Sequence, residues 1–343
     1  MFCTSPGLHT LRKREDRLRL GRKNKQACFV LRSACTIFAQ MISICIPIYN
    51  YNVTCLTRNL HLQLVATSNA FEILLMDDAS SSEYRKTNAA IDLPGIRYIQ
   101  LNENVGRAKI RNLLAAEAQY PYLIFMDCDS AVANNNYISD YLSYCQPGIV
   151  CYGGRIYAPE KPNDTTFLRW KYGVERESMP ASERKAIPMF GFCTNNFLID
   201  RNLFQQVRFN EELTGYGHED TFFGLELLAE GVAIDHIDNA LIHLGLEDAT
   251  IFLEKVENGM LNLLKIEKIL SEKHPTYAAH SKLIRTKMLL EKMHIKWLYT
   301  VIYTLFKPVM KRNLLGRKPC LFFFDLYRLG YLLSIEKTQH KNT

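Results

Sequence analysis

The feature that most constrains the fold is an apolar run, Tyr122–Met126, that stops at two acids separated by one residue, Asp127 and Asp129. Five apolar residues bounded by polar ones predict a strand buried on both faces, as in a parallel sheet covered by helices. In open α/β sheets, ligands bind beyond the carboxyl ends of the strands. We therefore expect Asp127 and Asp129 to lie where a ligand arrives, outside the core.

Two interpretations of this pair of acids stay open. Residues two apart in an extended chain point the same way, so Asp127 and Asp129 could share one divalent cation that also binds the diphosphate of a nucleotide. An Asx turn that closes the strand explains the same residues equally well.

Three earlier runs also predict strands, and they are Ile42–Ile46, Phe71–Met76 and Ile96–Leu101. We expect Pro47 to end the first strand, because proline cannot donate to a sheet, and to lead into a loop with Tyr49 and Asn50. The second strand ends in two acids, Asp77 and Asp78. Segments with helical spacing separate the runs, and this alternation predicts a parallel, right-handed, doubly wound sheet.

Two later features suggest parts of a site. Gly106 begins a predicted helix whose first turns carry Arg107 and Arg111, and basic side chains at a helix N-terminus suit an anion. Further on, Glu219 and Asp220 begin an amphipathic helix. Acids are favoured there by the helix dipole alone, but the glycines that precede them, Gly215 and Gly217, suit close approach of a ligand.

His243 lies in an apolar stretch, Ala240–Leu244. A histidine in such a context is ordinarily a hydrogen-bonded core residue. With Asp127 and Asp129 already considered for a cation, His243 is also a reasonable further ligand.

Charge divides the chain into an acidic body and two basic ends. Residues 1–40 hold nine Lys and Arg against two acids, residues 41–284 hold 21 against 30, and residues 285–343 hold 12 against three. An acidic body argues against nucleic-acid binding. The basic, apolar tail favours a membrane surface, although packing of the tail against the body explains its apolar residues equally well.

Composition also bears on localisation and on domain boundaries. The ten cysteines form no Cys-x-x-Cys pair, which is typical of reduced thiols in the cytoplasm. No apolar run approaches twenty residues, so we expect no membrane span. We expect a basic, disordered leader (1–40), a catalytic domain (41–248) and a helical, basic and apolar C-terminal extension (249–343). Translation of the native protein is expected to start at Met41; a membrane-binding basic arm is the other interpretation of the leader.

Five stretches, taken together and in order over residues 41–245, resemble the inverting, metal-dependent glycosyltransferases of family 2, which have the GT-A fold. The stretches are Ser43–Asn50, Met76–Ser80, Asn104–Asn112, Asp127–Asp129 and Gly217–Asp220. The resemblance implies a Rossmann-like, mostly parallel sheet, here with a C-terminal helical extension.

The resemblance also implies roles for single residues. Pro47, Tyr49, Asn50 and Asp78 would hold the nucleotide, with Tyr49 stacking on the base and Asp78 accepting from a ring N–H. Gly106, Arg107 and Arg111 would steady the phosphates or the donor sugar. Asp127 would lie by the ribose and the sugar, near the metal, and Asp129 would bind Mn²⁺ or Mg²⁺ together with His243. Asp220 would be the general base, and Glu219 would orient the acceptor or share that role.

The implied activity is inverting transfer of a sugar from a nucleotide-diphosphate sugar, with UDP the expected nucleotide, to a hydroxyl of a glycan or lipid-linked acceptor, as in surface polysaccharide synthesis. The expected location is the cytoplasmic face of a membrane. Two alternatives are a metal-dependent nucleotidyltransferase and an inactive nucleotide-sugar-binding protein at a membrane. The first lacks a glycine-rich, lysine-bearing signature near the first strand, and the intact Asp129 and Asp220 argue against the second.

Overall fold

The computed structural model describes residues 40–189, 191–213, 217–273 and 281–342. The predicted leader therefore lies, except for Gln40, outside the described residues, as do Gly215 and Tyr216. The first half of the described chain alternates strands and helices, as predicted: β1 (Ile42–Ile48), α2 (Thr54–Ala66), β2 (Phe71–Asp77), α3 (Ser82–Ala89), β3 (Ile96–Gln100), α4 (Arg107–Glu117) and β4 (Tyr122–Met126).

These four strands are parallel, with β1 between β2 and β4. Both faces of the sheet are covered, because Ile124 and Met126 of β4 belong to one hydrophobic cluster and Leu123 and Phe125 to another. Because side chains on both faces of β4 are buried, the strand is apolar at every position instead of alternating between apolar and polar residues.

The prediction that Pro47 ends the first strand is wrong. β1 continues to Ile48, and Pro47 stands opposite Met76 of β2. On the other side of β1, pairing with β4 reaches only to Cys45 and Phe125. Pro47 therefore lies where β1 has a neighbour on one side only, and a missing amide hydrogen is tolerated there.

Antiparallel pairing appears in the second half of the sheet. Strand β8 (Asn196–Asp200) runs antiparallel to both β4 and β6 (Val150–Tyr152), and β9 (Asp235–His236) lies parallel to β6. The order is β3-β2-β1-β4-β8-β6-β9. A mostly parallel sheet is thus confirmed. Short helices α5 (Tyr137–Leu142) and α8 (Arg201–Gln206), and the longer α9 (Glu219–Ala229), complete this half.

A second, three-stranded sheet brings distant segments together. Its order is β5 (Ser130–Val132), β10 (Leu241–His243) and β7 (Arg155–Ile156). His243 pairs with Ser130 across the antiparallel ladder, so it lies next to the acid that ends the β4 motif, Asp129. The segment between β7 and β8 is largely helical, with α6 (Phe167–Tyr172), a π-helix (Gly173–Glu177) and α7 (Ala181–Arg184).

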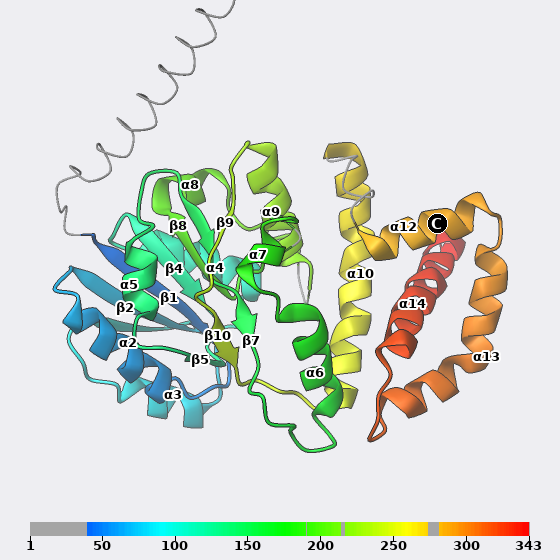
Figure 1. Ribbon diagram of the computed structural model, residues 1–343, viewed down its shortest axis with the longest axis horizontal. Helices are drawn as coiled ribbons and strands as arrows, with labels where there is room; N and C mark the ends of the chain where they lie inside the picture. Colours follow the sequence, from blue (N-terminus) through cyan, green and yellow to red (C-terminus); the bar gives the residue numbers. More distant parts are fainter. Residues whose placement is uncertain (1–39, 190, 214–216, 274–280, 343) are drawn as a thin grey trace, which may run out of the picture. The chain divides into compact units, whose positions relative to one another are not determined.

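In the described residues, the predicted C-terminal extension contains α10 (Ala249–Lys273), α12 (Lys282–Lys292), α13 (Lys296–Leu314) and α14 (Leu321–Asn342) (Figure 1). Helix α14 packs against both α10 and α13, and α10 also contacts α6 of the body. The division at residue 248 stays a prediction, because residues on both sides of it share one hydrophobic cluster that includes Leu168, Phe252 and Phe324. No helix in the described part of the chain is long and apolar enough to cross a membrane.

Candidate active site

A cavity of about 250 Å³ lies at the carboxyl end of β4. The end of β4 and the start of α9 both contribute residues that the sequence had indicated. Seven of the predicted site residues line it, and they are Arg107, Arg111, Asp127, Asp129, Glu219, Asp220 and His243. Segments more than 130 residues apart in the chain therefore meet at one place, as a site built from strand ends requires.

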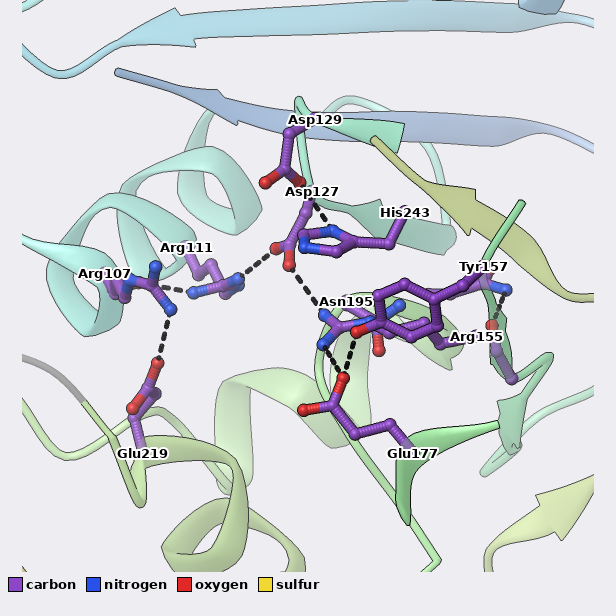
Figure 2. A network of polar contacts seen from close by, with 12 residues as sticks. Arg107, Arg111, Asp127, Asp129, Arg155, Tyr157, Glu177, Asn195, Glu219 and His243 are labelled. Carbon is purple, nitrogen blue, oxygen red and sulfur yellow. Dashed lines mark hydrogen bonds and ion pairs between the residues drawn. The ribbon is translucent and has the colours of Figure 1, made fainter. Parts of the chain in front are cut away.

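Asp129 and His243 face each other in this cavity (Figure 2). Asp129 Oδ1 lies 3.5 Å from His243 Nδ1, and neither that oxygen nor either ring nitrogen has a hydrogen-bond partner among the described residues. Burial alone would raise the pKa of Asp129, but His243 and two nearby arginines lower it to about 2. An ionised carboxylate beside a nitrogen donor, both without hydrogen bonds, fits a divalent cation.

Gly245 permits this arrangement. A Cβ atom at Gly245 would lie 2.1 Å from Asp129 Oδ2, too close for any other residue without displacing the carboxylate. The described residues contain no group of three or more His, Cys, Asp or Glu side chains able to hold a metal ion. A cation held by Asp129 and His243 would therefore complete its shell with ligands from the substrate or water, as Mg²⁺ commonly does.

Asp127 has different surroundings, although it is only two residues away. Its Oδ1 accepts from Arg111 Nη2 at 2.7 Å, and its Oδ2 accepts from Arg155 Nη2 at 3.3 Å. Both carboxylate oxygens are thus engaged by arginines (Figure 2). The geometry favours Asp129 over Asp127 as the metal ligand, and the metal role of Asp127 stays a prediction.

Glu219 and Asp220 begin α9 on the other side of the cavity, after His218 in the left-handed region (φ 72°). Glu219 Oε1 lies 3.4 Å from Arg107 Nη1. Burial would raise the pKa of Glu219, but Arg107 and Arg111 outweigh it and lower the pKa. Burial and the charge of Glu219 raise the pKa of Asp220 to about 6. The two neighbouring acids therefore differ: Glu219 is an ion-paired anion, and Asp220 can exchange a proton near neutral pH.

The predicted nucleotide-binding residues Pro47, Tyr49, Asn50, Asp78 and Gly106 are not among those that line this cavity. Asp78 accepts from the amides of Val105 (2.7 Å) and Gly106 (3.1 Å), so it fixes the turn that leads into Arg107. Gly106 has φ 84°, which few other residues adopt.

Asn50 and Tyr49, which directly follow β1, are the next two of these residues. Asn50 bonds to the backbone of Ser81 and to the hydroxyl of Ser80, which joins the ends of β1 and β2. Tyr49 is 54% exposed beside them. Its ring is therefore available to a ligand, and its stacking role stays a prediction.

A group of charged residues around Glu177 was missed by the sequence reading. Glu177 Oε2 accepts from Arg155 Nη1 at 3.2 Å and from Arg169 Nη2 at 3.1 Å, and it also accepts from the Tyr157 hydroxyl. Burial would raise the pKa of Glu177, but the two arginines lower it to about 2. The one available signal was the Gly153–Gly154 pair, which marks a turn directly before Arg155.

The C-terminal extension also forms part of the cavity. Phe252 and Lys255 of α10 and Phe324 and Arg328 of α14 line it, together with Tyr172 of α6. The centroids of the three aromatic rings lie between 5.0 and 5.7 Å apart. No motif indicated these residues, because they are ordinary core residues of amphipathic helices when read from the sequence.

Comparison with known proteins agrees with this geometry. The sequence model of glycosyl transferase family 2 matches residues 43–208. No curated protein matches the chain. Among solved structures, the mannosyltransferase PcManGT from Pyrobaculum calidifontis, in complex with GDP-Man and Mn²⁺, is 14% identical with a TM-score of 0.52, and the match covers 89% of each chain. GalNAc-T7 with UDP, GalNAc and Mn²⁺ is 17% identical with a TM-score of 0.46, over 60% of this chain and 43% of that one.

The match to PcManGT covers more of the chain than residues 1–248 contain, so it reaches into the C-terminal extension, and it shows a shared fold. The family match begins in β1 and ends just after α8, so it contains the four parallel strands and the Asp127–Asp129 motif. We conclude that residues 43–208 form a glycosyl transferase family 2 domain and that the chain is a glycosyltransferase with the GT-A fold.

Proposed function

We propose that this enzyme transfers a sugar, with inversion, from a nucleoside diphosphate sugar to a hydroxyl of a glycan or lipid-linked acceptor, as in surface polysaccharide synthesis. One observation carries the proposal: Asp129 with His243 and Glu219 with Asp220 line the same cavity. Sugar transfer needs a stabilised leaving diphosphate and a base for the acceptor hydroxyl at one place.

Asp129 and His243 are proposed to hold Mn²⁺ or Mg²⁺, because they are adjacent and because Asp129 Oδ1 and both His243 ring nitrogens have no hydrogen-bond partner among the described residues. Such an ion supplies Lewis-acid stabilisation of the departing diphosphate. PcManGT, which shares the fold, is a complex with Mn²⁺. Arg107 and Arg111 lie beside this pair at the start of α4, where side-chain charge and helix N-terminus both favour phosphate oxygens.

Asp220 is proposed as the general base. A pKa of about 6 leaves the carboxylate ionised at neutral pH and still basic enough to accept a proton from the attacking hydroxyl. Glu219 keeps its charge through Arg107, and that charge is part of what raises the pKa of Asp220. The cavity also contains Cys193, but burial raises the pKa of its thiol to about 12, so it is not a nucleophile at neutral pH. With Asp220 as base, we propose a single displacement and hence inversion.

The nucleotide is proposed to lie toward Tyr49, Asn50 and Asp78, with UDP-sugars the first donors to test. Nucleotide release from a panel of UDP-, GDP- and TDP-sugars, measured with Mn²⁺ and with EDTA, tests the function. We expect release with one donor class, its loss with EDTA, and its loss in Asp129→Asn. Asp235→Asn, an exposed acid on β9, is the matched control.

Three outcomes of this panel separate the candidates. Metal-dependent release from one donor class supports the transferase. Binding of nucleotide sugars without release or transfer would favour the inactive binding protein. Release of pyrophosphate from nucleoside triphosphates would favour the nucleotidyltransferase. Unchanged release in Asp129→Asn would overturn the metal site.

Helix α13 supports a peripheral position on an anionic membrane, which we propose to be the cytoplasmic face. Its exposed face carries Trp297, Val301, Leu305 and Val309, of which Trp297 and Leu305 are 67% and 70% exposed. Lys296, Lys307, Lys311 and Arg312 lie on the same helix. A helix with an apolar face and basic residues suits anionic lipid. The described cysteines are free, as expected in a reducing compartment.

The C-terminal extension also lines the cavity, so removing residues 285–343 would damage the site as well as the membrane face. Trp297→Glu and Leu305→Glu test the membrane proposal alone. Both should abolish cosedimentation with vesicles containing phosphatidylglycerol. Leu62→Glu, a 69% exposed leucine on α2, should not. Equal sedimentation of all three variants would contradict the proposal.

A further inference from the structure

Arg328 is the cavity cation whose charge the structure leaves uncompensated. Six Lys and Arg side chains line the cavity. Five of them are ion-paired to cavity carboxylates, and these five are Arg107, Arg111, Arg155, Arg169 and Lys255. Arg328 forms neither an ion pair nor a side-chain hydrogen bond with any residue in the described ranges, and its guanidinium lies 5.7 Å from the Phe324 ring centroid. A partly buried cation without a counter-charge suits an anionic ligand.

The position of Arg328 in the cavity indicates which substrate carries that anion. His218 directly precedes Glu219 and Asp220, and its pKa is lowered to about 4 by burial and then by the charge of Arg328. The packing gives the same placement: Leu332 of α14, one helical turn after Arg328, belongs to one hydrophobic cluster with Phe222 and Leu225 of α9, the helix that Glu219 and Asp220 begin. Arg328 therefore lies on the side of the cavity that carries the base.

In a single displacement, the acceptor hydroxyl must lie within hydrogen-bond reach of the base. A group bound beside the base thus belongs to the acceptor, whereas the donor diphosphate belongs to the metal side. The ring of Phe324, one helical turn before Arg328, forms an aromatic wall with Tyr172 and Phe252. Phe252 and Phe324 are 3% and 1% exposed, so they support the partly exposed ring of Tyr172, which is the member of this wall that a sugar ring can contact. Arg328 lines the same cavity and offers paired N–H donors.

We propose that Arg328 binds an anionic group of the acceptor, a phosphoryl or carboxylate group attached close to the reacting hydroxyl. This inference rests on the proposed function and narrows its acceptor class. A phosphoryl group would be that of a lipid carrier or sugar phosphate, and a carboxylate would be that of an acidic sugar. Both offer the two oxygens that a guanidinium binds side by side.

Binding to nucleotide-loaded enzyme tests this proposal. The full chain is saturated with Mg²⁺ and the nucleoside diphosphate of the donor class found active, so that the donor phosphate sites are occupied. The probes are a hexose 1-phosphate, a hexuronate and a neutral methyl hexoside, measured by titration calorimetry. We expect one anionic probe to bind the wild type at least about tenfold more tightly than the methyl hexoside, as a charged hydrogen-bonded pair provides.

Two substitutions at Arg328 decide the role of the side chain. Arg328→Gln should remove the anionic preference and leave the affinity for the methyl hexoside and for the nucleoside diphosphate unchanged. Arg328→Lys should retain part of the preference, because it keeps the charge without the planar fork. Arg58→Gln, an exposed arginine on α2, should behave as the wild type. The probe that is preferred distinguishes the phosphoryl source from the carboxylate source.

The outcomes also separate this inference from the proposed function. If the wild type shows no anionic preference, or if Arg328→Gln retains it, the inference is wrong even when donor hydrolysis is normal. If Arg328→Gln instead weakens nucleoside diphosphate binding about tenfold or more, Arg328 serves the donor and the inference is also wrong. If no nucleotide sugar is hydrolysed or bound by the wild type, the proposed function itself fails.

Discussion

The two walls of the cavity differ in how their charges are arranged. On the wall built from strand and helix ends of the body, Arg107, Arg111 and Arg155 are each paired to a carboxylate. On the wall built from α10 and α14, the uncharged lining residues are apolar, and Arg328 has no carboxylate partner in the described part of the chain. The first wall is an electrostatically balanced network held in place before substrate binds. The second wall is an apolar surface with one cation, Arg328, that no carboxylate of the described residues pairs.

This difference suggests a division of labour. Arginines and carboxylates that are already ion-paired do not have to reorganise when charge develops during the reaction. Such a network suits the chemical step, which relatives of this enzyme share. An apolar wall that carries Arg328 suits recognition of a particular acceptor. An acceptor without an anionic group would leave the charge of Arg328 unpaired and would therefore bind more weakly. Substitutions in the first wall should therefore affect the chemical step, and substitutions in the second should affect stability and acceptor binding.

The largest expected effect is at Asp220. Asp220→Asn removes the base, so transfer should fall by about 10²- to 10⁴-fold while donor binding is kept, because no donor contact is lost. Single-turnover transfer and nucleotide titration measure the two quantities. Loss of donor binding as well would contradict the role of Asp220 as base.

Two phenylalanines on α14 provide the sharpest test of the second wall. Phe324 is 1% exposed and Phe322 is 65% exposed. Phe324→Ala should lower the free energy of unfolding by about 3 kcal/mol, because it leaves a cavity among packed rings. It should also raise KM for the acceptor more than KM for the donor. Phe322→Ala should change the free energy of unfolding by less than about 0.5 kcal/mol in chemical denaturation. Equal effects would show that the second wall is not packed as described.

Glu177 connects the two walls through Arg155 and Arg169. Glu177→Gln removes the charge that these two arginines share, although each keeps another carboxylate partner. We expect a loss of about 2 kcal/mol in the free energy of unfolding, the size of a hydrogen bond to a charged group. Glu175→Gln, two residues earlier with a half-exposed side chain, is the control for the same urea titration. A loss no larger than in the control would show that the shared charge does not stabilise the fold.

The smallest expected effect is a shift of the pH profile. Because the base acts as the anion and its pKa is raised to about 6, kcat/KM should fall about tenfold per pH unit below that value. Glu219→Gln removes a negative charge beside Asp220, which lowers the pKa of Asp220, so the acid limb should move to lower pH. Glu183→Gln, an exposed acid on α7, should leave the limb in place. A limb that moves to higher pH in Glu219→Gln would contradict the coupling.

The sequence by itself determined the parallel half of the sheet and one wall of the site. The apolar runs of β1, β2 and β4 and the polar residues at their ends are local patterns, and the carboxyl ends of parallel strands necessarily meet at one edge. These patterns predicted Asp129 and Arg107 in one place. They failed for Pro47, because whether a strand continues past proline depends on how many neighbours it has at that residue.

Only the tertiary structure decided the rest. His243 pairs with Ser130, and Asp127 forms ion pairs with two arginines. These contacts join segments far apart in the chain, and the periodicity of the sequence does not encode them. The second wall depends on the way α14 packs against α10, and in the sequence its residues have the spacing of ordinary core positions. Local sequence pattern fixes where a strand or helix forms and which side is apolar, whereas the counter-charges and neighbours of a side chain are set by the packing of those elements.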